Sequence, residues 1–213
     1  MPLFYQQDIN ETTRLGIWKI EEPEAFFLQS VPLQRNITHP LSRLQHLAGR
    51  FLLLVLFPDF PHEEIEIADT RKPFLPDEMY HFSISHCGHY AAAIVSNKER
   101  VGIDVELIGP RVDKVKHKFL HTTELAFVNA QDMNQQIALL TTLWSAKEAM
   151  YKWWGRGDLS FGESLRTFPF LLENTGLINA QFSKENREIS LQLDYQIRND
   201  ISLVWLHTDA GIF

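Results

Sequence analysis

The order of strand-like and helix-like patterns limits the fold of this chain more than any other feature. Strand-like patterns occur in two blocks, within residues 64–107 and 188–207, while the clearest helical patterns cover 42–56 and 137–154. A doubly wound parallel sheet would need strands and helices that alternate strictly along the chain. The order therefore predicts a mixed α+β fold.

The patterns also give the expected boundaries of the elements. Apolar residues at helical spacing predict a helix from Ser42 to about Leu56, capped by Ser42, and a long helix from about Ile137 to Trp154. Residues 86–89 are expected to form a loop, and residues 22–30 have a weaker helical pattern. Alternating or continuous apolar runs predict the strands Glu64–Ala68, His81–Ser85, Tyr90–Val95, Val101–Leu107, Glu188–Ile197 and Ile201–His207.

Composition excludes several classes of protein. With 213 residues, 45% of them hydrophobic, the chain can bury a sizeable core and is not disordered. A formal net charge of -7 argues against binding nucleic acid over a broad surface. Its single cysteine, Cys87, is typical of a reducing compartment, and no pattern of a signal peptide or a membrane span is present. We expect a cytoplasmic protein with no membrane or nucleic-acid partner.

The predicted strand Val101–Leu107 carries two acidic residues on one face. Because side chains alternate along a strand, Gly102, Asp104 and Glu106 share one face and the apolar residues share the other. Asp104 and Glu106 lie about 7 Å apart along the strand, so their side chains can converge on one cation, with space beside Gly102. The competing interpretation is a half-buried strand with a polar outer face.

The predicted helix 137–154 stacks Trp144, Glu148 and Lys152 at intervals of four residues. One interpretation is an ordinary solvated Glu–Lys pair. The other makes Glu148 a third carboxylate for the same cation and places Lys152 next to a developing anion. The large aromatic side chains on this face favour the second interpretation.

A third polar group lies in the segment 81–90. Ser85 and His86 come at the end of a predicted strand and precede a glycine turn, so they offer a hydroxyl, an imidazole and backbone N–H groups to an anion. An ordinary hairpin turn would have the same pattern. Zinc is not favoured, because Cys87 is the only cysteine and His117 with His121 completes no ligand set.

Together these three segments resemble the 4′-phosphopantetheinyl transferase superfamily. The last two of the matching segments look like the family's signature pair, and the resemblance extends from Arg71 to about Lys152. The segments are Ser83-Ile84-Ser85-His86, Val101-Gly102-Ile103-Asp104-Val105-Glu106 and Trp144-Ser145-Ala146-Lys147-Glu148-Ala149-Met150-Tyr151-Lys152.

The length of the chain resembles the larger, Sfp-like type of this family. That type has two similar α/β halves packed as an internal pseudo-dimer, with the active site between them. The resemblance implies an N-terminal half, 1–104, that contacts the nucleotide of coenzyme A. It also implies a C-terminal half, 105–213, that carries the metal-binding catalytic helix.

Enzymes of this family transfer 4′-phosphopantetheine from coenzyme A to a serine of an apo acyl or peptidyl carrier protein. The reaction releases 3′,5′-ADP and depends on Mg²⁺, a hard cation that suits carboxylate and phosphate oxygens. The resemblance implies that Asp104, Glu106 and Glu148 bind the metal. It also implies Glu148 as the catalytic base and Lys152 as the group that steadies the pyrophosphate.

Four residues are implied as contacts of coenzyme A. Ser85 and His86 would hold phosphate groups, and Arg43 would contact the nucleotide phosphates unless it lies on a solvated helix face. Lys72 belongs to a turn that resembles the family's Gly-Lys-Pro turn, in which Arg71 replaces the usual glycine.

A basic cluster follows the strand 101–107. It is expected to contact the acidic helix of the carrier protein or a coenzyme A phosphate, although a solvated charge run is the competing interpretation. Its members are Arg111, Lys114, Lys116, His117 and Lys118. Two alternatives stand for the whole chain: another Mg²⁺-dependent phosphoryl transferase or hydrolase, and a catalytically silent binding module of the same fold. A monomer is expected by resemblance.

Overall fold

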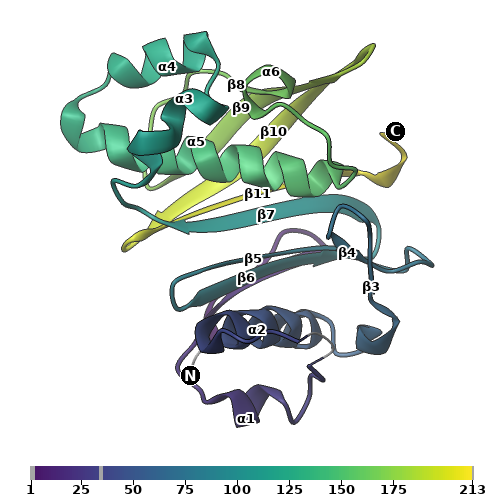
Figure 1. Ribbon diagram of the computed structural model, residues 1–213. Coiled ribbons are helices and arrows are strands. Elements are labelled where there is room, and N and C mark those ends of the chain that lie inside the picture. The colour runs from purple at the N-terminus through teal and green to yellow at the C-terminus, as the bar shows by residue number, and fades with distance from the viewer. Residues whose placement is uncertain (1–2, 34–35, 213) are drawn as a thin grey trace. The chain divides into compact units, whose positions relative to one another are not determined.

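The computed structural model describes residues 3–33 and 36–212, which form two compact units (Figure 1). Unit 1 consists of Met1–Val101 with Thr208–Phe213, and unit 2 consists of Gly102–His207. Each unit combines helices with an antiparallel sheet, which confirms the predicted α+β fold class. The functional division into halves 1–104 and 105–213 stays a prediction.

In unit 1 one long helix covers a four-stranded sheet. The helix is α2 (Pro40–Leu56), and its apolar residues Leu47, Leu52 and Leu56 pack in one core with Ala91 and Ala93 of the sheet. The strand order is β1 (Leu3–Asp8), β2 (Thr13–Lys19), β6 (Tyr90–Ser96) and β5 (His81–Cys87).

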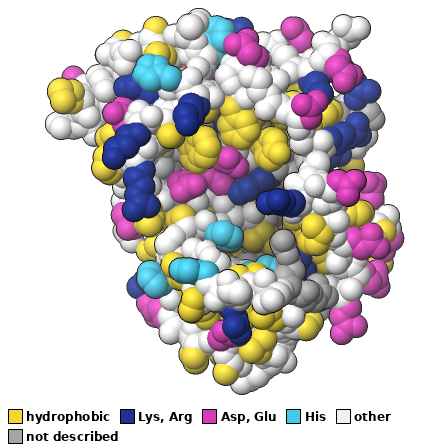
Figure 2. Space-filling model, viewed as in Figure 1, with side chains coloured by type: hydrophobic (Ala, Val, Ile, Leu, Met, Phe, Trp, Pro, Cys, Tyr) yellow, Lys and Arg dark blue, Asp and Glu magenta, His cyan; other side chains and the backbone are white. Residues whose placement is uncertain are grey.

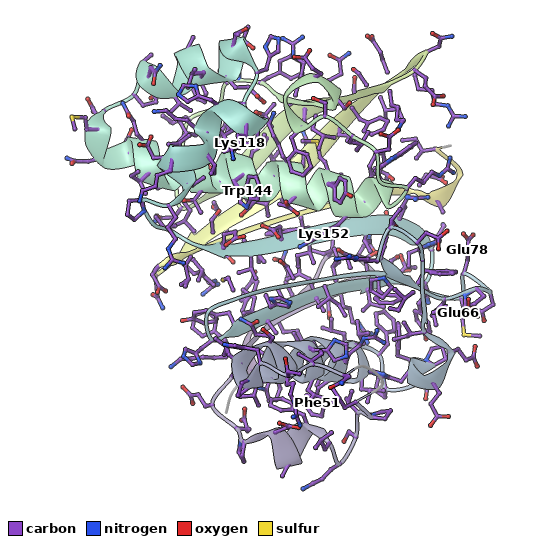
Figure 3. The ribbon with its side chains drawn as sticks, in the orientation of Figure 1. Phe51, Glu66, Glu78, Lys118, Trp144 and Lys152 are labelled. Atoms are coloured by element: carbon purple, nitrogen blue, oxygen red, sulfur yellow. The ribbon has the colours of Figure 1, made fainter. Side chains whose placement is uncertain are left out.

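An aromatic cluster extends this core beyond α2. Phe51 of α2, labelled in Figure 3, lies with its ring centroid 5.1 Å from Trp18 and 5.7 Å from Phe27. Phe27 belongs to the short helix α1 (Glu24–Phe27) and is fully buried. The rings therefore fasten α1 to α2 and to strand β2.

In unit 2 the longest helix lies along a five-stranded sheet (Figure 1). The helix is α5 (Met133–Trp154), which ends at Gly155 in the left-handed conformation, with φ 71°. The strand order is β7 (Glu99–Leu107), β11 (Ile201–Asp209), β10 (Arg187–Arg198), β9 (Thr175–Lys184) and β8 (Leu165–Thr167). The shorter helices of this unit are η2 (Val112–Val115), α3 (Lys116–Phe119), α4 (Thr122–Asn129) and α6 (Phe161–Ser164).

Ring contacts identify the sheet face that carries α5. Phe182 of β9 lies 5.6 Å from the ring centroid of Trp153 and 4.8 Å from that of Trp154. Ile178 and Ala180 alternate with exposed residues along β9 and share the face of Phe182. This face is buried beneath the C-terminal end of α5.

Most predicted elements are present with shifted bounds. Helix α2 begins at Pro40, and the prediction of Ser42 as its cap is wrong, because His39 is the N-cap and its ring accepts a hydrogen bond from the Ser42 N–H at 3.4 Å. Helix α5 begins earlier than expected, at Met133. The predicted loop 86–89 is reduced to a tight turn, because β5 continues to Cys87 and pairs there with Tyr90.

Two short strands replace the predicted strand at residues 64–68. They are β3 (Glu66–Ile67) and β4 (Pro73–Phe74), which pair with each other, and the 3-10 helix η1 (His62–Glu64) precedes them. The strands β1, β2, β8 and β9 were not predicted. Four consecutive residues of β2, 15–18, are buried, so this central strand shows no clean alternation of apolar and polar residues.

No helix of the described residues is long and apolar enough to cross a membrane.

Arg71→Gly is expected to stabilise unit 1 by about 0.5–1 kcal/mol. Arg71 lies in the turn between β3 and β4 with φ 67°, a conformation that strains any side chain with a Cβ and that glycine adopts freely. Urea denaturation measures the change. Arg71→Ala is the control, because it removes the charge and keeps the Cβ, and an equal gain from both variants would contradict the backbone explanation.

Candidate functional site

The acidic residues of β7 lie on a face that helix α5 approaches very closely. A Cβ added at Gly102 would lie 2.2 Å from the carbonyl oxygen of Ala149 and 2.8 Å from the Cβ of Trp153. The expected space beside Gly102 is therefore filled by α5. Because Asp104 and Glu106 share the face of Gly102, this contact brings α5 next to both carboxylates.

The strand is buried on both faces near its centre. Asp104 is 2% exposed, and Ile103 and Val105 on the opposite face are fully buried. A half-buried strand with a solvated polar face is therefore the wrong interpretation for Asp104. Since burying a carboxylate is costly unless it is paired, the position calls for a cationic partner.

Two side chains of α5 contact the acids of β7. Lys152 Nζ donates to Asp104 Oδ1 at 2.7 Å, and Trp144 Nε1 donates to Glu106 Oε1 at 3.3 Å. Figure 3 labels Trp144 and Lys152 along α5. Glu148 lies midway between them on the same stripe of the helix. We call Asp104, Glu106 and Glu148 the carboxylate group.

The members of the carboxylate group disfavour one another's charge. Burial, with a smaller contribution from Asp104, raises the pKa of Glu106 to about 7, while the hydrogen bond from Trp144 and the charge of Lys152 oppose this rise. Burial and Asp104 also raise the pKa of Glu148. Because nearby carboxylates repel in a partly desolvated site, a cation bound among them would favour the ionised forms.

The oxygen donors of the carboxylate group fit a hard divalent cation such as Mg²⁺. Within residues 3–33 and 36–212, the structure shows no group of three or more His, Cys, Asp or Glu side chains arranged so that they could hold a metal ion. In the present arrangement the ammonium of Lys152 supplies the positive charge at Asp104. His121, considered for zinc, instead caps α4, where its ring accepts from the Thr123 N–H.

An apolar groove with a volume of about 430 Å³ opens beside Trp144. Phe119 and Phe161 flank the indole, with ring centroids 5.1 and 5.8 Å from it. Val115, Leu159 and Ser160 complete the lining with Lys118, which Figure 3 labels on α3. On the face shown in Figure 2, acidic side chains gather next to hydrophobic and basic ones over the region of α5 and β7.

Three of the predicted coenzyme A contacts, Arg43, Ser85 and His86, have different surroundings, and their roles stay predictions. In unit 1, Arg43 of α2 forms an ion pair with Glu24 of α1, so it is not on a fully solvated helix face. Ser85 is buried and His86 is exposed, because consecutive residues of β5 point to opposite faces.

Lys72 lies in the turn before β4. Burial, together with the charge of Arg100, lowers the pKa of Lys72 to about 7. A phosphate group beside this amine would favour its charged form. The predicted role therefore suits the local electrostatics, although the contact itself stays a prediction.

The basic cluster of unit 2 lies along η2 and α3. Lys114, His117 and Lys118 are exposed, whereas Lys116 donates to Asp113 at 2.8 Å, one turn away. Arg111 is exposed as well, so these four residues are the part of the cluster available to an acidic partner.

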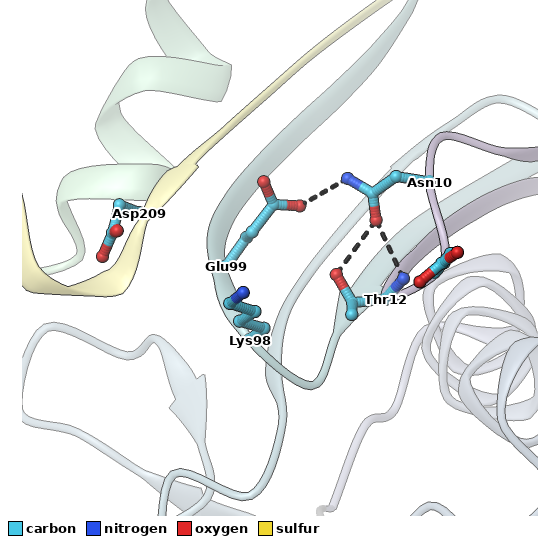
Figure 4. Close-up of a pocket in the computed structure, with 6 residues that line it drawn as sticks. Asn10, Thr12, Lys98, Glu99 and Asp209 are labelled. Carbon is cyan, nitrogen blue, oxygen red and sulfur yellow. Dashed lines mark hydrogen bonds between the residues drawn. The ribbon is translucent and has the colours of Figure 1, made fainter.

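A second concavity lies in unit 1, apart from every predicted site residue (Figure 4). Asn10 Nδ2 donates to Glu99 Oε2 at 2.8 Å, and Asn10 Oδ1 accepts from the Thr12 backbone at 2.9 Å. Glu11, Lys98 and Asp209 complete the polar lining. These contacts account for the concavity as a hydrogen-bonded loop junction.

Sequence reasoning gave no role to Trp144, which contacts Glu106, or to the buried residues Lys147 and Glu124. Trp144 and Lys147 belong to the family motif at residues 144–152, so that motif was the sequence signal that could have identified them. Glu124 is on α4, in the capping box that it forms with His121, and that box is visible in the sequence only once the helix start is known.

Comparison with known proteins finds similarity over the part of the chain that carries this candidate site. Residues 100–204 match the family model described as the 4′-phosphopantetheinyl transferase superfamily, and this range includes the carboxylate group and Lys152. Three curated relatives are similar to parts of the chain.

The relative that the chain covers best of these three is 4′-phosphopantetheinyl transferase AcpT of Escherichia coli O157:H7. It is 31% identical over 145 residues, which cover 63% of this chain and 73% of the relative. The 4′-phosphopantetheinyl transferase of Bacillus subtilis is 36% identical over 117 residues, covering 54% of this chain and 50% of the relative.

The third relative is 4′-phosphopantetheinyl transferase gsp of Aneurinibacillus migulanus. It is 32% identical over 113 residues, covering 52% of this chain and 46% of the relative. The chain thus spans about half the length of two of these curated relatives. The match to AcpT and the match to the family model confirm the resemblance to this superfamily seen in the sequence. The chain belongs to the 4′-phosphopantetheinyl transferase superfamily.

Proposed function

We propose that this protein transfers 4′-phosphopantetheine from coenzyme A to a serine of an apo acyl or peptidyl carrier protein, with release of 3′,5′-ADP. One observation carries the proposal. In a chain of this family, the carboxylate group lies on β7 and α5 with Lys152 paired to Asp104. Such a set suits the transfer of a phosphoryl group, in which charge on phosphate oxygens must be neutralised.

The carboxylate group would hold Mg²⁺, which when bound neutralises charge on the pyrophosphate oxygens. Glu148 accepts the proton of the carrier serine, directly or through a water molecule, because it is the carboxylate of α5 and lies between Trp144 and Lys152. Lys152 leaves Asp104 for the pyrophosphate and stabilises the negative charge there. Trp144 keeps Glu106 oriented through its indole N–H.

Unit 1 would supply the contacts to coenzyme A in this proposal. Lys72, Ser85 and His86 are the candidates for its phosphate groups, and Arg43 would exchange Glu24 for a phosphate of the nucleotide. A guanidinium can donate two parallel N–H groups to either a carboxylate or a phosphate, so this exchange keeps the charge of Arg43 paired.

We also propose that the chain is of the larger, pseudo-dimeric type and acts as a cytoplasmic monomer. In support, each of the two units has an antiparallel sheet covered by one long helix, α2 in unit 1 and α5 in unit 2. Size-exclusion chromatography with light scattering tests the monomer directly.

Carrier-dependent release of 3′,5′-ADP tests the proposed reaction. Coenzyme A and Mg²⁺ are incubated with the protein, with and without an apo carrier, and nucleotide products are separated by chromatography. We expect 3′,5′-ADP only when the carrier is present. Release without a carrier would indicate a hydrolase or another phosphoryl transferase, and no release with any carrier would indicate a silent binding module.

Mg²⁺ is expected to raise the thermal midpoint of the protein more at about pH 8 than at about pH 6. The pKa of Glu106 is raised to about 7, so without metal its contribution to stability is complete at low pH and is lost as the pH rises through 7. A bound cation favours the ionised carboxylate, so its effect is largest where Glu106 is ionised.

Thermal unfolding with and without Mg²⁺ at both pH values measures this difference. Glu106→Gln is the matched control, and it should shrink the pH dependence because glutamine does not titrate. An equal Mg²⁺ effect at both pH values in the unchanged protein would count against Glu106 as a ligand.

Reversing the charges of Lys114 and Lys118 is expected to raise the KM for the carrier by about tenfold and to leave kcat unchanged. Both lysines are exposed on η2 and α3, and their attraction to an acidic carrier helix would be screened by salt. Steady-state kinetics with varied carrier concentration measures the effect. Lys19→Glu with Lys98→Glu in unit 1 is the control, and an equal rise in KM there would remove the docking role of the cluster.

A further inference from the structure

A second buried ion pair of unit 2 lies outside the carboxylate group. Lys147, which directly precedes Glu148 on α5, lies with its Nζ 2.7 Å from Oε2 of Glu124 on α4. The two side chains are 0% and 2% exposed. Glu124 Oε2 also accepts the backbone N–H of His121 at 2.7 Å, which closes the capping box of α4. Such a pair persists only where further hydrogen bonds offset its desolvation.

Those further hydrogen bonds are present. Lys147 Nζ donates to the carbonyl oxygens of Phe161 at 2.9 Å and Leu165 at 2.5 Å. Glu124 Oε1 accepts from the backbone N–H and the hydroxyl of Thr167, each at 2.7 Å. An ammonium has three donors, so every proton of Lys147 has an acceptor. The pair therefore ties α5 to α4, to the start of α6 and to β8.

Phe161 connects this pair to the carboxylate group. Lys147 holds the Phe161 carbonyl, and the Phe161 ring lies 5.8 Å from the Trp144 centroid and 5.4 Å from the Tyr151 centroid. Trp144 in turn donates its indole N–H to Glu106. The chain of contacts from Lys147 to Glu106 lies entirely within unit 2.

We propose that Lys147 and Glu124 are positioning residues for the carboxylate group. Their hydrogen bonds fix the rotation of α5 about its axis, and with it the directions in which Trp144 and Glu148 point. Neither residue touches the reacting atoms. The effect on catalysis rests on the proposed function, whereas the effect on the Trp144 indole does not.

Hydrogen exchange of the indole N–H groups tests this inference without any transfer reaction. The protein has five tryptophans, and Trp144→Phe identifies the Trp144 signal in the NMR spectrum. The variant with Lys147→Met and Glu124→Gln removes both charges at nearly constant volume, so no buried charge is left alone. We expect exchange at Trp144 to be about tenfold faster relative to Trp154, whose indole donates to Gly157 O elsewhere in unit 2.

Kinetics supply the second readout. In the same double variant we expect kcat to fall about 10- to 100-fold while the KM for coenzyme A changes by less than about threefold. The control for the kinetics is Lys184→Met, which removes an ammonium from the more exposed ion pair with Asp158 in the same unit and should leave kcat unchanged.

A folded double variant whose Trp144 indole exchanges as fast as in the unchanged protein would overturn the inference. Equal acceleration of exchange at Trp144 and Trp154 would also overturn it, because that result reports a general loss of stability. If the unchanged protein transfers nothing, the proposed function fails and the exchange ratio still decides the positioning role. If the double variant does not fold, Phe161→Leu takes its place. It removes the connecting ring, and unaltered Trp144 exchange in it would equally overturn the inference.

Discussion

Replacing Glu148 by Gln is expected to lower kcat for phosphopantetheine transfer by about 100-fold or more while the protein stays folded. Glutamine keeps the volume of the side chain but loses the charge that binds the cation and the oxygen that accepts the serine proton. Glu148 is the only Asp or Glu within α5 (Met133–Trp154), so no other carboxylate of this helix can replace it. Steady-state kinetics with coenzyme A, Mg²⁺ and an apo carrier measures the loss, and circular dichroism checks the fold.

Two further variants sharpen this result. Asp104→Asn removes the ion pair with Lys152 and should cause a loss of similar size. Glu188→Gln is the matched control, because Glu188 is an exposed glutamate of β10 in the same unit and contacts Gln181 instead of the carboxylate group. Full activity of Glu148→Gln, or an equal loss in Glu188→Gln, would contradict the assigned role.

Gly102→Ala is expected to lower the free energy of unfolding by about 3 kcal/mol. The added Cβ would lie 2.2 Å from the Ala149 carbonyl oxygen, so α5 must move away from β7. That movement lengthens the contacts of Trp144 and Lys152 with the two acids of the strand, and weaker Mg²⁺ binding should accompany the loss of stability. Urea denaturation and calorimetric titration with Mg²⁺ measure the two effects.

Gly109→Ala provides the comparison for this substitution. A Cβ at Gly109 would have as its nearest atom the Leu107 carbonyl oxygen, at 4.0 Å. Gly109→Ala should therefore lower the free energy of unfolding by no more than about 0.5 kcal/mol. Equal free energies of unfolding for Gly102→Ala and Gly109→Ala would contradict this account. Close packing at Gly102 would then not be what holds α5 next to the carboxylates.

Local periodicity explains why part of the site could be predicted from the sequence. Alternation along Val101–Leu107 places Asp104 and Glu106 on one face, and helical spacing places Trp144, Glu148 and Lys152 on one stripe. Both statements depend only on neighbouring residues. The structure adds that the strand face and the helix stripe meet, through the hydrogen bonds of Lys152 to Asp104 and Trp144 to Glu106.

Tertiary contacts explain what could not be predicted. The ion pair of Arg43 with Glu24 and the burial of Lys147 depend on how separate helices pack, which no local pattern encodes. The cap of α2 was misplaced because His39 is an unusual capping residue, whereas Ser42 is a common one. Strand β2 was missed because both its faces are buried.

The glycine of the strand motif gains a physical meaning from the structure. In the sequence, Gly102 suggested open space beside Asp104 and Glu106. In the structure, that space is occupied by the backbone of α5 at Ala149. The glycine therefore serves the site indirectly, by allowing the helix that carries Glu148 and Lys152 to lie against the strand.

The intact mass of a carrier protein tests the central claim most directly. An apo acyl or peptidyl carrier is incubated with coenzyme A, Mg²⁺ and the protein, and is then weighed by mass spectrometry beside a carrier whose acceptor serine is replaced by alanine. The account predicts that the carrier gains one phosphopantetheine group, that the alanine carrier gains none, and that Glu148→Gln abolishes the gain. A carrier mass that stays unchanged with every one of several acyl and peptidyl carriers would contradict it.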